Sequence, residues 1–373
     1  MLTQVTSGMT DTNAQYYGFK SRIINGGMGI DQRNNGGSVG NPVGATYTLD
    51  RWLAAGFASS KYTIQQTPSA TETGYATRVA AGFTNYLAVT SSSAYSVPSG
   101  EYYVINQYIE GFNTADLAFG TANAKTITLS FLAYSSLTGT FGGALRNSGD
   151  NRSYPFTYTI SSANTWTQIS ITIPGDTSGT WIGATNGVGL RVCFSLGTGS
   201  TYSGTAGSWS SNNYSSATGA TSVVGTNGAT FYLTGVQIEK GTQATSFDYR
   251  PYGTELALCQ RYYQSINFSE AQGSYTKFGN GVAYSTIGAR VNVFLLVKMR
   301  TYPSLVVTST ASNYGLYTTS DLACNSVPTI NSNSNPSVAT IEMSVASGLS
   351  AGNIVLAQAN NNQSAYVGFS AEL

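Results

Sequence analysis

Residues 230–264, TFYLTGVQIEKGTQATSFDYRPYGTELALCQRYYQ, decide the fold, because a strand pattern there gives way to a helix pattern. The apolar residues of the strand change parity halfway, with Phe231 and Leu233 on one face and Val236 and Ile238 on the other. A β-bulge inserts one extra residue and moves every later side chain to the opposite face. We therefore predict a bulge at residues 234–235, in a strand that completes a large β-domain.

The second half of the same stretch predicts a short helix at residues 254–264. Thr254 can cap it by accepting a hydrogen bond from a free amide, and Glu255 suits the positive end of the helix dipole. Leu256, Cys259 and Tyr263 then follow at helical spacing. This stripe packs either on its own subunit or against identical copies around a symmetry axis, which makes these three residues the candidate oligomer interface.

Upstream of this stretch, apolar and polar residues alternate with a period of two. In KTITLSFLAY, Ile127, Leu129 and Phe131 share one face and Thr128 and Ser130 the other, which predicts a half-buried strand. Similar patterns occur in SYPFTYTI, TQISITIPG and GVGLRVCFSL. Strands separated by Gly, Ser, Asn and Thr turns indicate a jelly-roll β-sandwich over residues 22–253. The long polar stretch 197–228 is expected to be functional or disordered.

Downstream of residue 264 the alternation resumes. Its inward-pointing candidates are Val291, Val293, Leu295, Val297, Met299, Ile341, Met343, Val345, Val367, Phe369 and Ala371. They predict a second, smaller β-sandwich at residues 265–373. The fold class predicted for the whole chain is therefore all-β, with a short linker helix between two sandwiches.

Composition narrows the possible functions. Charged residues make up 9% of the 373 residues, and 17 basic against 16 acidic residues give a net charge of +1. Without a cluster of Lys or Arg the chain is not expected to bind nucleic acid. The longest apolar run, VFLLVKM, is too short to span a bilayer, so we expect no membrane insertion. No basic and apolar leader is evident at the N-terminus, which predicts assembly in a cytoplasm.

The residues available for chemistry are few. There is no histidine, which removes the usual general base and the usual transition-metal ligand. Three widely separated cysteines fit neither a disulfide framework nor a zinc site, so we predict reduced, buried thiols and no cofactor. Asp150 and residues 175–177 could supply oxygen ligands for calcium, but we interpret residues 175–177 as a polar turn. The acidic residues that could form a glycosidase pair are scattered: Glu101, Glu110, Asp116, Asp150 and Asp176.

Aromatic residues give the strongest functional signal. They make up 12% of the chain and include 26 tyrosines. Ring faces edged by amides and carboxylates are typical of sugar-binding sites, because a ring stacks on the C–H face of a sugar while polar groups bind its hydroxyls. The candidates near predicted loops or strand ends are Trp166, Trp181, Trp209 and Tyr214. For any one of them, a place in the core or at a sheet edge is the simpler explanation.

The string GVQIEKGTQATSFDYRPYGTELALCQRYYQ resembles a junction of tail-fibre and receptor-binding proteins of tailed bacteriophages, and of surface proteins of large algal viruses. The resemblance extends upstream through SRIINGGMGIDQRN, TYTLDRW, SYPFTYTI and NTWTQISITIPGDTSGTW, to cover roughly residues 20–264. It implies a carbohydrate-binding-like domain, and so favours a glycan-contacting patch that includes Trp181, Trp209 and Tyr214.

The resemblance also implies a setting. The protein would be a homotrimer on the virion, in the tail or on the capsid surface, with residues 1–21 attaching it to other virion proteins and a host-surface glycan as its ligand. A capsid decoration, head-fibre or tail-joining protein without glycan binding is the alternative, and a polysaccharide depolymerase is a third. We expect a binding protein and no enzyme.

Overall fold

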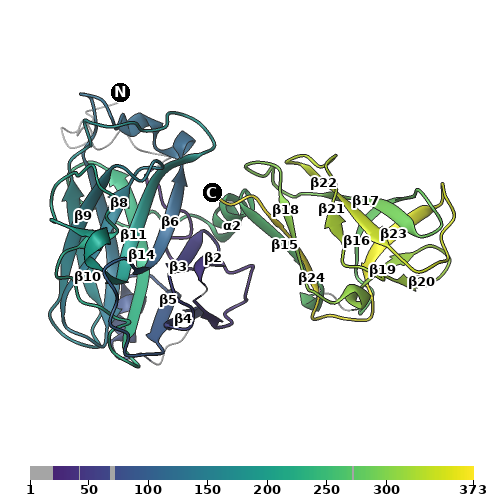
Figure 1. Ribbon diagram of the computed structural model, residues 1–373, viewed down its shortest axis with the longest axis horizontal. Helices are drawn as coiled ribbons and strands as arrows, with labels where there is room; N and C mark the ends of the chain where they lie inside the picture. Colours follow the sequence, from purple (N-terminus) through teal and green to yellow (C-terminus); the bar gives the residue numbers. More distant parts are fainter. Residues whose placement is uncertain (1–19, 42, 68–71, 271–272) are drawn as a thin grey trace, which may run out of the picture. The chain divides into compact units, whose positions relative to one another are not determined.

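The structure is a computed structural model that describes residues 20–41, 43–67, 72–270 and 273–373. The chain is almost entirely β-structure and divides into two compact units (Figure 1). Unit 1 ends at Pro251 and takes in Leu373, and unit 2 comprises Tyr252–Glu372. The division lies close to residue 253, where the sequence predicts the end of the first sandwich.

Unit 1 contains two six-stranded antiparallel sheets among its described residues. Sheet A consists, in spatial order, of β1 (Val39–Gly40), β4 (Tyr62–Thr67), β5 (Tyr86–Ser91), β14 (Thr230–Lys240), β7 (Ile127–Ser135) and β10 (Thr167–Ile173). Sheet B consists of β2 (Gly44–Leu49), β3 (Trp52–Gly56), β6 (Tyr102–Glu110), β11 (Val188–Thr198), β8 (Gly139–Arg146) and β9 (Ser153–Ile160). Because the chain crosses repeatedly from one sheet to the other, the sandwich is a jelly roll, as predicted.

The inner faces of the two sheets form the core of unit 1. The alternating residues of β9, Tyr154, Phe156, Tyr158 and Ile160, all point into it. Phe131 of sheet A contacts Phe194 of sheet B edge to face, with ring centroids 5.0 Å apart. Burying one such side chain stabilises the fold by about 1.5–3 kcal/mol, so the period-two pattern accounts for the sandwich.

The predicted bulge is present in β14. The register against β7 shifts between Thr234 and Gln237, and Gly235 has a φ of 63°. The four apolar residues on either side of the shift, Phe231, Leu233, Val236 and Ile238, are all fully buried in the same core. β14 is the last strand of unit 1 in sequence and lies inside sheet A, between β5 and β7.

The prediction of a half-buried strand at β7 is wrong, because all of its residues are buried. Its inward residues join the core as expected, but Leu132 and Tyr134 on the other face belong to a second apolar cluster outside sheet A. That cluster also contains Phe83, Tyr86, Ala88 and Trp166. Side chains from outside the sheet therefore cover the outer face of β7.

The long stretch 197–228 is ordered and tied to sheet B. It contains a short parallel pair, β12 (Ser203–Gly204) and β13 (Ser216–Ala217). The Cys193 thiol of β11 donates to the Ser215 carbonyl (3.3 Å), and the Trp209 indole donates to the Pro174 carbonyl (2.7 Å). Such contacts fix the loop on unit 1, so of the two expectations for this stretch the disordered one does not hold.

Unit 2 contains a three-stranded and a seven-stranded sheet among its described residues. The first consists of β15 (Tyr263–Asn267), β24 (Tyr366–Ser370) and β18 (Ser304–Val307). The second consists of β20 (Asp321–Ala323), β19 (Tyr314–Tyr317), β23 (Ile354–Ala359), β16 (Lys277–Ala283), β17 (Gly288–Phe294), β22 (Val338–Ser344) and β21 (Thr329–Ile330). Its core includes Val291, Ile341, Met343, Val367 and Phe369, as the alternation predicts.

Helices are short. They are α1 (Tyr75–Ala80) and α2 (Tyr252–Gln260), with 3-10 turns at Gly111–Asn113, Ala115–Leu117, Ser200–Tyr202, Phe268–Glu270 and Ala311–Asn313. The predicted bounds of the second helix are wrong: α2 starts before Thr254, which therefore cannot be its cap, and ends at Gln260. Tyr263 is the first residue of β15, because its backbone pairs with Ser370 of β24.

The candidate interface stripe is therefore divided between two elements. Cys259 on α2 and Tyr263 on β15 are buried within the chain, whereas Leu256 is partly exposed. A side chain at Gly368 of β24 would meet the Tyr263 hydroxyl at 2.5 Å, so the tyrosine packs tightly on its own unit. Of the three residues, Leu256 retains the most surface for a partner.

The three cysteines are free and buried, as predicted. Burial raises the pKa of the Cys193 and Cys324 thiols to about 12. In the described ranges, no helix is long and apolar enough to cross a membrane. Nor do three His, Cys, Asp or Glu side chains gather there in a way that could hold a metal ion.

Candidate functional site

Two of the four aromatic residues predicted from the sequence lie together. The rings of Trp181 and Trp209 meet edge to face with centroids 5.6 Å apart, and Phe119 contacts both, at 4.9 Å and 5.7 Å. A cavity of about 330 Å³ beside them is lined mainly by apolar groups, including Ile182 and Leu190. We call Phe119, Trp181 and Trp209 the tryptophan cluster.

Hydrogen bonds within the protein occupy both indole N–H groups of this cluster. Trp181 donates to an Asp176 carboxylate oxygen (3.2 Å), and Trp209 donates to the Pro174 carbonyl (2.7 Å). Asp176 is in turn held by both ends of the Arg152 guanidinium, at 2.6 Å and 2.7 Å. The cluster is thus well fixed, but it offers a ligand apolar ring surface and no indole donor.

The other two predicted aromatic residues lie elsewhere. Tyr214 packs on Gly204, where an added side chain would meet its ring at 2.2 Å, and its hydroxyl accepts a hydrogen bond from Asn212. Trp166 is only 4% exposed and contacts Tyr86 and Tyr134 on the outside of sheet A. Trp166 therefore presents no ring face for a sugar to stack on.

The outer face of sheet B brings together residues that the sequence analysis did not single out. Alternation along β6 turns Tyr102, Asn106 and Tyr108 outward, while Tyr103 and Ile105 point into the core. In register, Tyr108 lies opposite Arg191 of β11, and Asn106 lies opposite Cys193. At a rise of about 3.3 Å per residue, Tyr102 and Tyr108 are about 20 Å apart along the strand. The motif YYVINQY at residues 102–108 could have indicated this face, because its outward positions include two tyrosines and an asparagine.

One end of this face is aromatic. Tyr102 contacts both Phe57 and Tyr202 edge to face, with ring centroids 5.0 Å apart in each pair. Phe57 and Tyr202 lie tilted to each other at 6.0 Å. Phe57 follows β3 and is 43% exposed, and Tyr202 belongs to the ordered loop. Burial raises the pKa of Tyr102, so its phenol stays neutral and can both donate and accept a hydrogen bond.

The other end combines charge with an aromatic ring. The Arg191 guanidinium lies over the Tyr108 ring, 4.8 Å from its centroid, and pairs with Asp150 at 2.5 Å. Arg146 also pairs with Asp150, at 2.6 Å, while the carboxylate remains 41% exposed. Burial raises the pKa of Tyr108, against a smaller opposing effect of the Arg191 charge. A ligand at this end would meet a fixed carboxylate and a stacked guanidinium.

Asn106 lies between the two ends. Its side chain is only 5% exposed, yet the amide makes no hydrogen bond to any residue that the structure describes. An unpaired amide at a nearly buried position is unfavourable unless water or a ligand satisfies it. We call Phe57, Tyr102, Asn106, Tyr108, Arg191 and Tyr202 the sheet B face.

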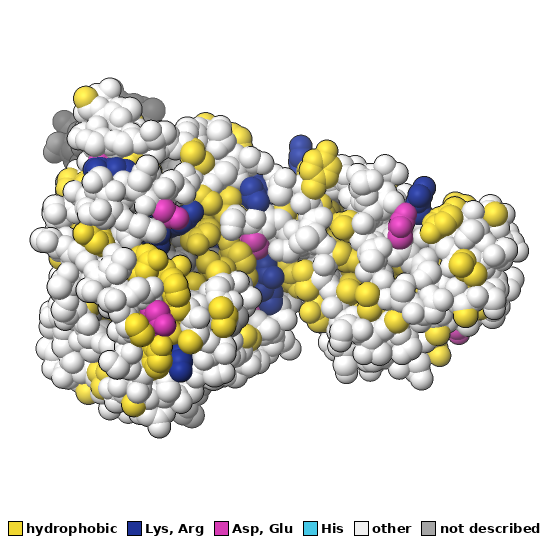
Figure 2. Space-filling model, viewed as in Figure 1, with side chains coloured by type: hydrophobic (Ala, Val, Ile, Leu, Met, Phe, Trp, Pro, Cys, Tyr) yellow, Lys and Arg dark blue, Asp and Glu magenta, His cyan; other side chains and the backbone are white. Residues whose placement is uncertain are grey.

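Apart from Arg146, Asp150 and Arg191, the residues described for this face are uncharged. Figure 2 shows hydrophobic side chains in broad patches on unit 1, separated by polar side chains and by a few acidic and basic groups. This matches the 9% of charged residues in the sequence. The site is thus suited to a ligand recognised by rings and hydrogen bonds more than by charge.

Four of the five candidate acids for glycosidase chemistry have polar partners, and the fifth, Glu110, is buried. Asp150 and Asp176 pair with arginines, and Asp116 pairs with Arg22. Glu101 accepts hydrogen bonds from the Tyr95 and Tyr103 hydroxyls. In the junction, Asp248 pairs with Arg250, and Glu239 accepts hydrogen bonds from Thr245.

No protein-family model matches the chain, and no curated protein matches it either. Among solved structures it is similar to a family 11 carbohydrate-binding module from Clostridium thermocellum in complex with a β-1,3-1,4-mixed-linked tetrasaccharide, at 13% identity and a TM-score of 0.27, over 55% of this chain and 100% of that one. TmCBM61 in complex with β-1,4-galactotriose matches 52% of this chain and 91% of its own, at 6% identity and a TM-score of 0.26.

A third similar structure is the enzymatically active domain of tailspike protein 4 from bacteriophage CBA120, at 12% identity and a TM-score of 0.28. That match covers 51% of this chain and 19% of the tailspike. All three TM-scores are below 0.3, so these structures do not indicate what this chain does. Its function has to be inferred from its own side chains.

Proposed function

We propose that the protein is a glycan-binding virion protein of a tailed bacteriophage, a trimeric tail fibre or receptor-binding protein whose sheet B face recognises a host-surface glycan. The observation that carries this proposal is the arrangement on that face. An exposed Phe57 ring and two partly exposed tyrosines stand at one end, an arginine stacked on a tyrosine stands at the other, and the Asn106 amide lies between them.

Each part of the sheet B face fits a sugar chain. The rings of Phe57 and Tyr202 supply apolar surface for the C–H face of a pyranose. The Asn106 amide has donors and an acceptor for neighbouring hydroxyls, and the Asp150 carboxylate accepts further hydrogen bonds. A few polar groups within an apolar surface are what gives a small-molecule site its specificity.

Binding without catalysis is supported by the carboxylates. A glycosidase needs two acidic groups placed on either side of the scissile bond. Here both oxygens of Asp176 are held by Arg152, one oxygen each of Asp150 and Asp116 pairs with arginine, and one oxygen of Glu101 accepts from two phenols. A depolymerase remains the third alternative, and release of reducing sugar from host polysaccharide would identify it.

The virion setting is supported by the resemblance of the junction at residues 235–264 and by the low charge of the chain. Surfaces with a net charge near zero tend to associate, which suits a homotrimer and contacts with other virion proteins. Residues 1–21 are the proposed attachment segment, of which 1–19 lie outside the described residues. A capsid decoration, head-fibre or tail-joining role without glycan binding is the alternative.

An array of bacterial surface polysaccharides tests the proposal directly. The purified protein should bind at least one glycan, and Phe57→Ala and Tyr202→Ala should each weaken that binding by about threefold to tenfold, since one aromatic contact contributes about 0.5–1.5 kcal/mol. Tyr302→Ala is the matched control, because it removes an exposed tyrosine from unit 2 and should change nothing. Absence of binding to every glycan, or equal binding by all variants, would refute the proposed face.

A further inference from the structure

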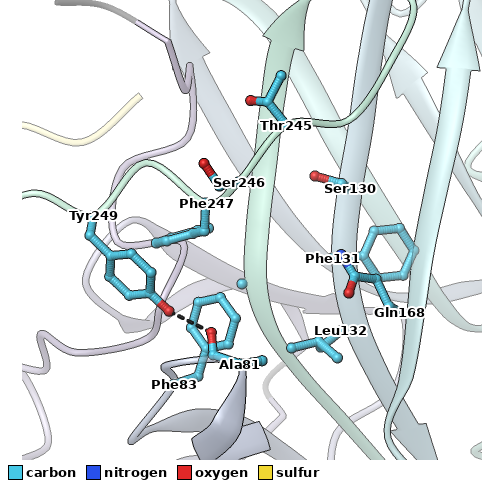
Figure 3. Close-up of a pocket in the computed structure, with 11 residues that line it drawn as sticks. Ala81, Phe83, Ser130, Phe131, Leu132, Gln168, Thr245, Ser246, Phe247 and Tyr249 are labelled. Atoms are coloured by element: carbon cyan, nitrogen blue, oxygen red, sulfur yellow. Dashed lines mark hydrogen bonds between the residues drawn. The ribbon is translucent and has the colours of Figure 1, made fainter.

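A separate pocket of about 270 Å³ opens on the outer face of sheet A, at the bulge in β14 (Figure 3). It belongs to neither the sheet B face nor the tryptophan cluster. Its main side chains are Phe83, Phe247 and Tyr249 on one side and Ser130, Leu132 and Gln168 on the other. We call it the bulge pocket.

The bulge itself creates the floor of this pocket. Pairing between β14 and β7 is interrupted between Thr234 and Gln237, beside Leu132. Gly235 occupies the gap with a φ of 63°, and a Cβ there would lie 2.6 Å from the Phe83 ring. Because Gly235 has no side chain, Phe83 can lie close against the strand and the floor stays open.

A folded-back segment builds the upper wall. Glu239 accepts hydrogen bonds from the backbone and the hydroxyl of Thr245, at 2.8 Å and 2.7 Å. Gln237 accepts one from the Asp248 backbone (2.9 Å) and donates to Glu239 (2.9 Å). Both residues point outward from sheet A after the bulge, and both are buried. They fix the segment 245–248 over the sheet.

Three rings form the aromatic side. Phe247 meets both Phe83 and Tyr249 edge to face with centroids 4.9 Å apart, and Phe83 lies 5.6 Å from Tyr249. The Tyr249 hydroxyl donates to the Ala81 carbonyl (2.7 Å), as the dashed line in Figure 3 shows. This bond fixes the ring while leaving the residue 56% exposed. The rings of Phe83, Phe247 and Tyr249 therefore give the pocket an aromatic wall on which a ligand can stack.

The opposite side carries two polar groups that have no hydrogen-bond partner in the part of the chain that the structure describes. Ser130 is only 7% exposed, yet its hydroxyl makes no hydrogen bond to any described residue. The exposed Gln168 amide also has no partner among them, and in Figure 3 it extends toward the middle of the pocket. A nearly buried hydroxyl that is not satisfied internally is a binding group for water or a ligand. Among the described residues, none of the side chains that line the pocket is charged, and beside it the Lys20 ammonium donates to the Ser246 carbonyl.

From this geometry we infer that the bulge pocket binds a single neutral pyranose ring. The rings of Tyr249 and Phe247 stack on the C–H face of the sugar, and Ser130 and Gln168 bind its hydroxyls. Its volume lies near the lower end of the range for small-molecule sites, which suits one ring and excludes a long chain within the pocket. The described lining side chains carry no cation to pair with the carboxylate of a uronic or sialic acid, so a neutral sugar is the expected ligand.

This site is independent of the proposed sheet B face, because the two lie on opposite sheets of the sandwich. A protein with both could hold two parts of one polysaccharide, or two neighbouring chains. Weak sites that act together gain avidity through effective concentration, without any new contact. The pocket would thus be a secondary glycan site.

The test is saturation-transfer NMR on the full-length protein with methyl glycosides of glucose, galactose, mannose and N-acetylglucosamine, and with glucuronate as the charged probe. At least one neutral glycoside should bind. Gln168→Ala and Ser130→Ala should each raise its Kd by about twofold to tenfold, as expected for one hydrogen bond, and Tyr249→Ala should raise it further. Tyr302→Ala, which removes an exposed tyrosine of unit 2, should leave this Kd unchanged.

Three results would overturn the assignment: no neutral glycoside binds, glucuronate binds at least as tightly, or the Ser130→Ala and Gln168→Ala double variant keeps the Kd of the parent protein. Because Gln168 is on the surface, its variant should fold normally, and tryptophan fluorescence can verify this. Loss of polysaccharide binding in the Phe57 and Tyr202 variants bears on the sheet B face alone, so the two sites can fail separately.

Discussion

Replacing Gly235 by alanine tests the account of the bulge on which the last strand of unit 1 depends. The backbone there has a φ of 63°, and a left-handed conformation costs a residue with a Cβ about 1–2 kcal/mol. The new methyl group would also lie 2.6 Å from the Phe83 ring, which is itself fixed by Phe247 and Tyr249. Overpacking of this kind costs about 1–3 kcal/mol. We therefore expect Gly235→Ala to destabilise unit 1 by about 2–5 kcal/mol.

The chain provides a matched control at Gly228. Its φ of 74° is similar, but a Cβ there would meet nothing within 4 Å. Gly228→Ala should therefore incur only the backbone cost of about 1–2 kcal/mol. The difference between the two variants isolates the collision with Phe83.

Tryptophan fluorescence measures this difference in the full-length protein. All four tryptophans, Trp52, Trp166, Trp181 and Trp209, belong to unit 1, so their emission reports the unfolding of that unit. For a unit of this size 1 kcal/mol lowers the midpoint by about 2–4 °C. Gly235→Ala should therefore melt about 2–12 °C below Gly228→Ala. Equal midpoints would show that Phe83 moves freely and that Gly235 is not needed for packing.

Two further predictions concern buried groups. Arg152→Ala should destabilise unit 1 by about 3–5 kcal/mol, because it leaves the buried Asp176 carboxylate without its cation. Arg290→Ala breaks an exposed pair with Glu342 and should cost only about 0–1 kcal/mol. Calorimetry that gives the two variants equal stability losses would contradict this. The thiols should not react with Ellman's reagent at pH 8 until the protein is unfolded. Burial raises the pKa of Cys193 and Cys324 to about 12, so both stay protonated at that pH. Rapid labelling of the native protein would show that the thiols are accessible.

Much of the fold follows from local patterns. A strand buries alternate residues, so the inward faces of β9 and β11 could be predicted from period two alone. The bulge could also be predicted, because one extra residue leaves a visible change of parity at residues 234–235. The ends of α2 could not, since β15 takes up Tyr263 through pairing with a distant strand.

The outward faces could not be predicted in the same way, because their environment depends on what packs over them. Leu132 and Tyr134 alternate like solvent-facing residues, yet side chains from other segments bury them. Trp181 and Trp209 were identified as candidates, but only the fold brings their rings to 5.6 Å. Nothing local distinguishes the unpaired amide of Asn106 from any other polar residue on a strand.

The bulge connects the core to the surface of sheet A. Before it, odd-numbered residues of β14 point inward, and after it even-numbered residues do, so Gln237 and Glu239 are turned outward with their polar ends toward the segment 245–248. Without the extra residue the same positions would enter the apolar core, where neither could find these partners. The bulge therefore has two effects. It places Val236 and Ile238 in the core, and it turns Gln237 and Glu239 outward, where they hydrogen-bond to the segment that forms the wall of the bulge pocket. The wall of the pocket is therefore fixed by hydrogen bonds to the strand that carries the bulge.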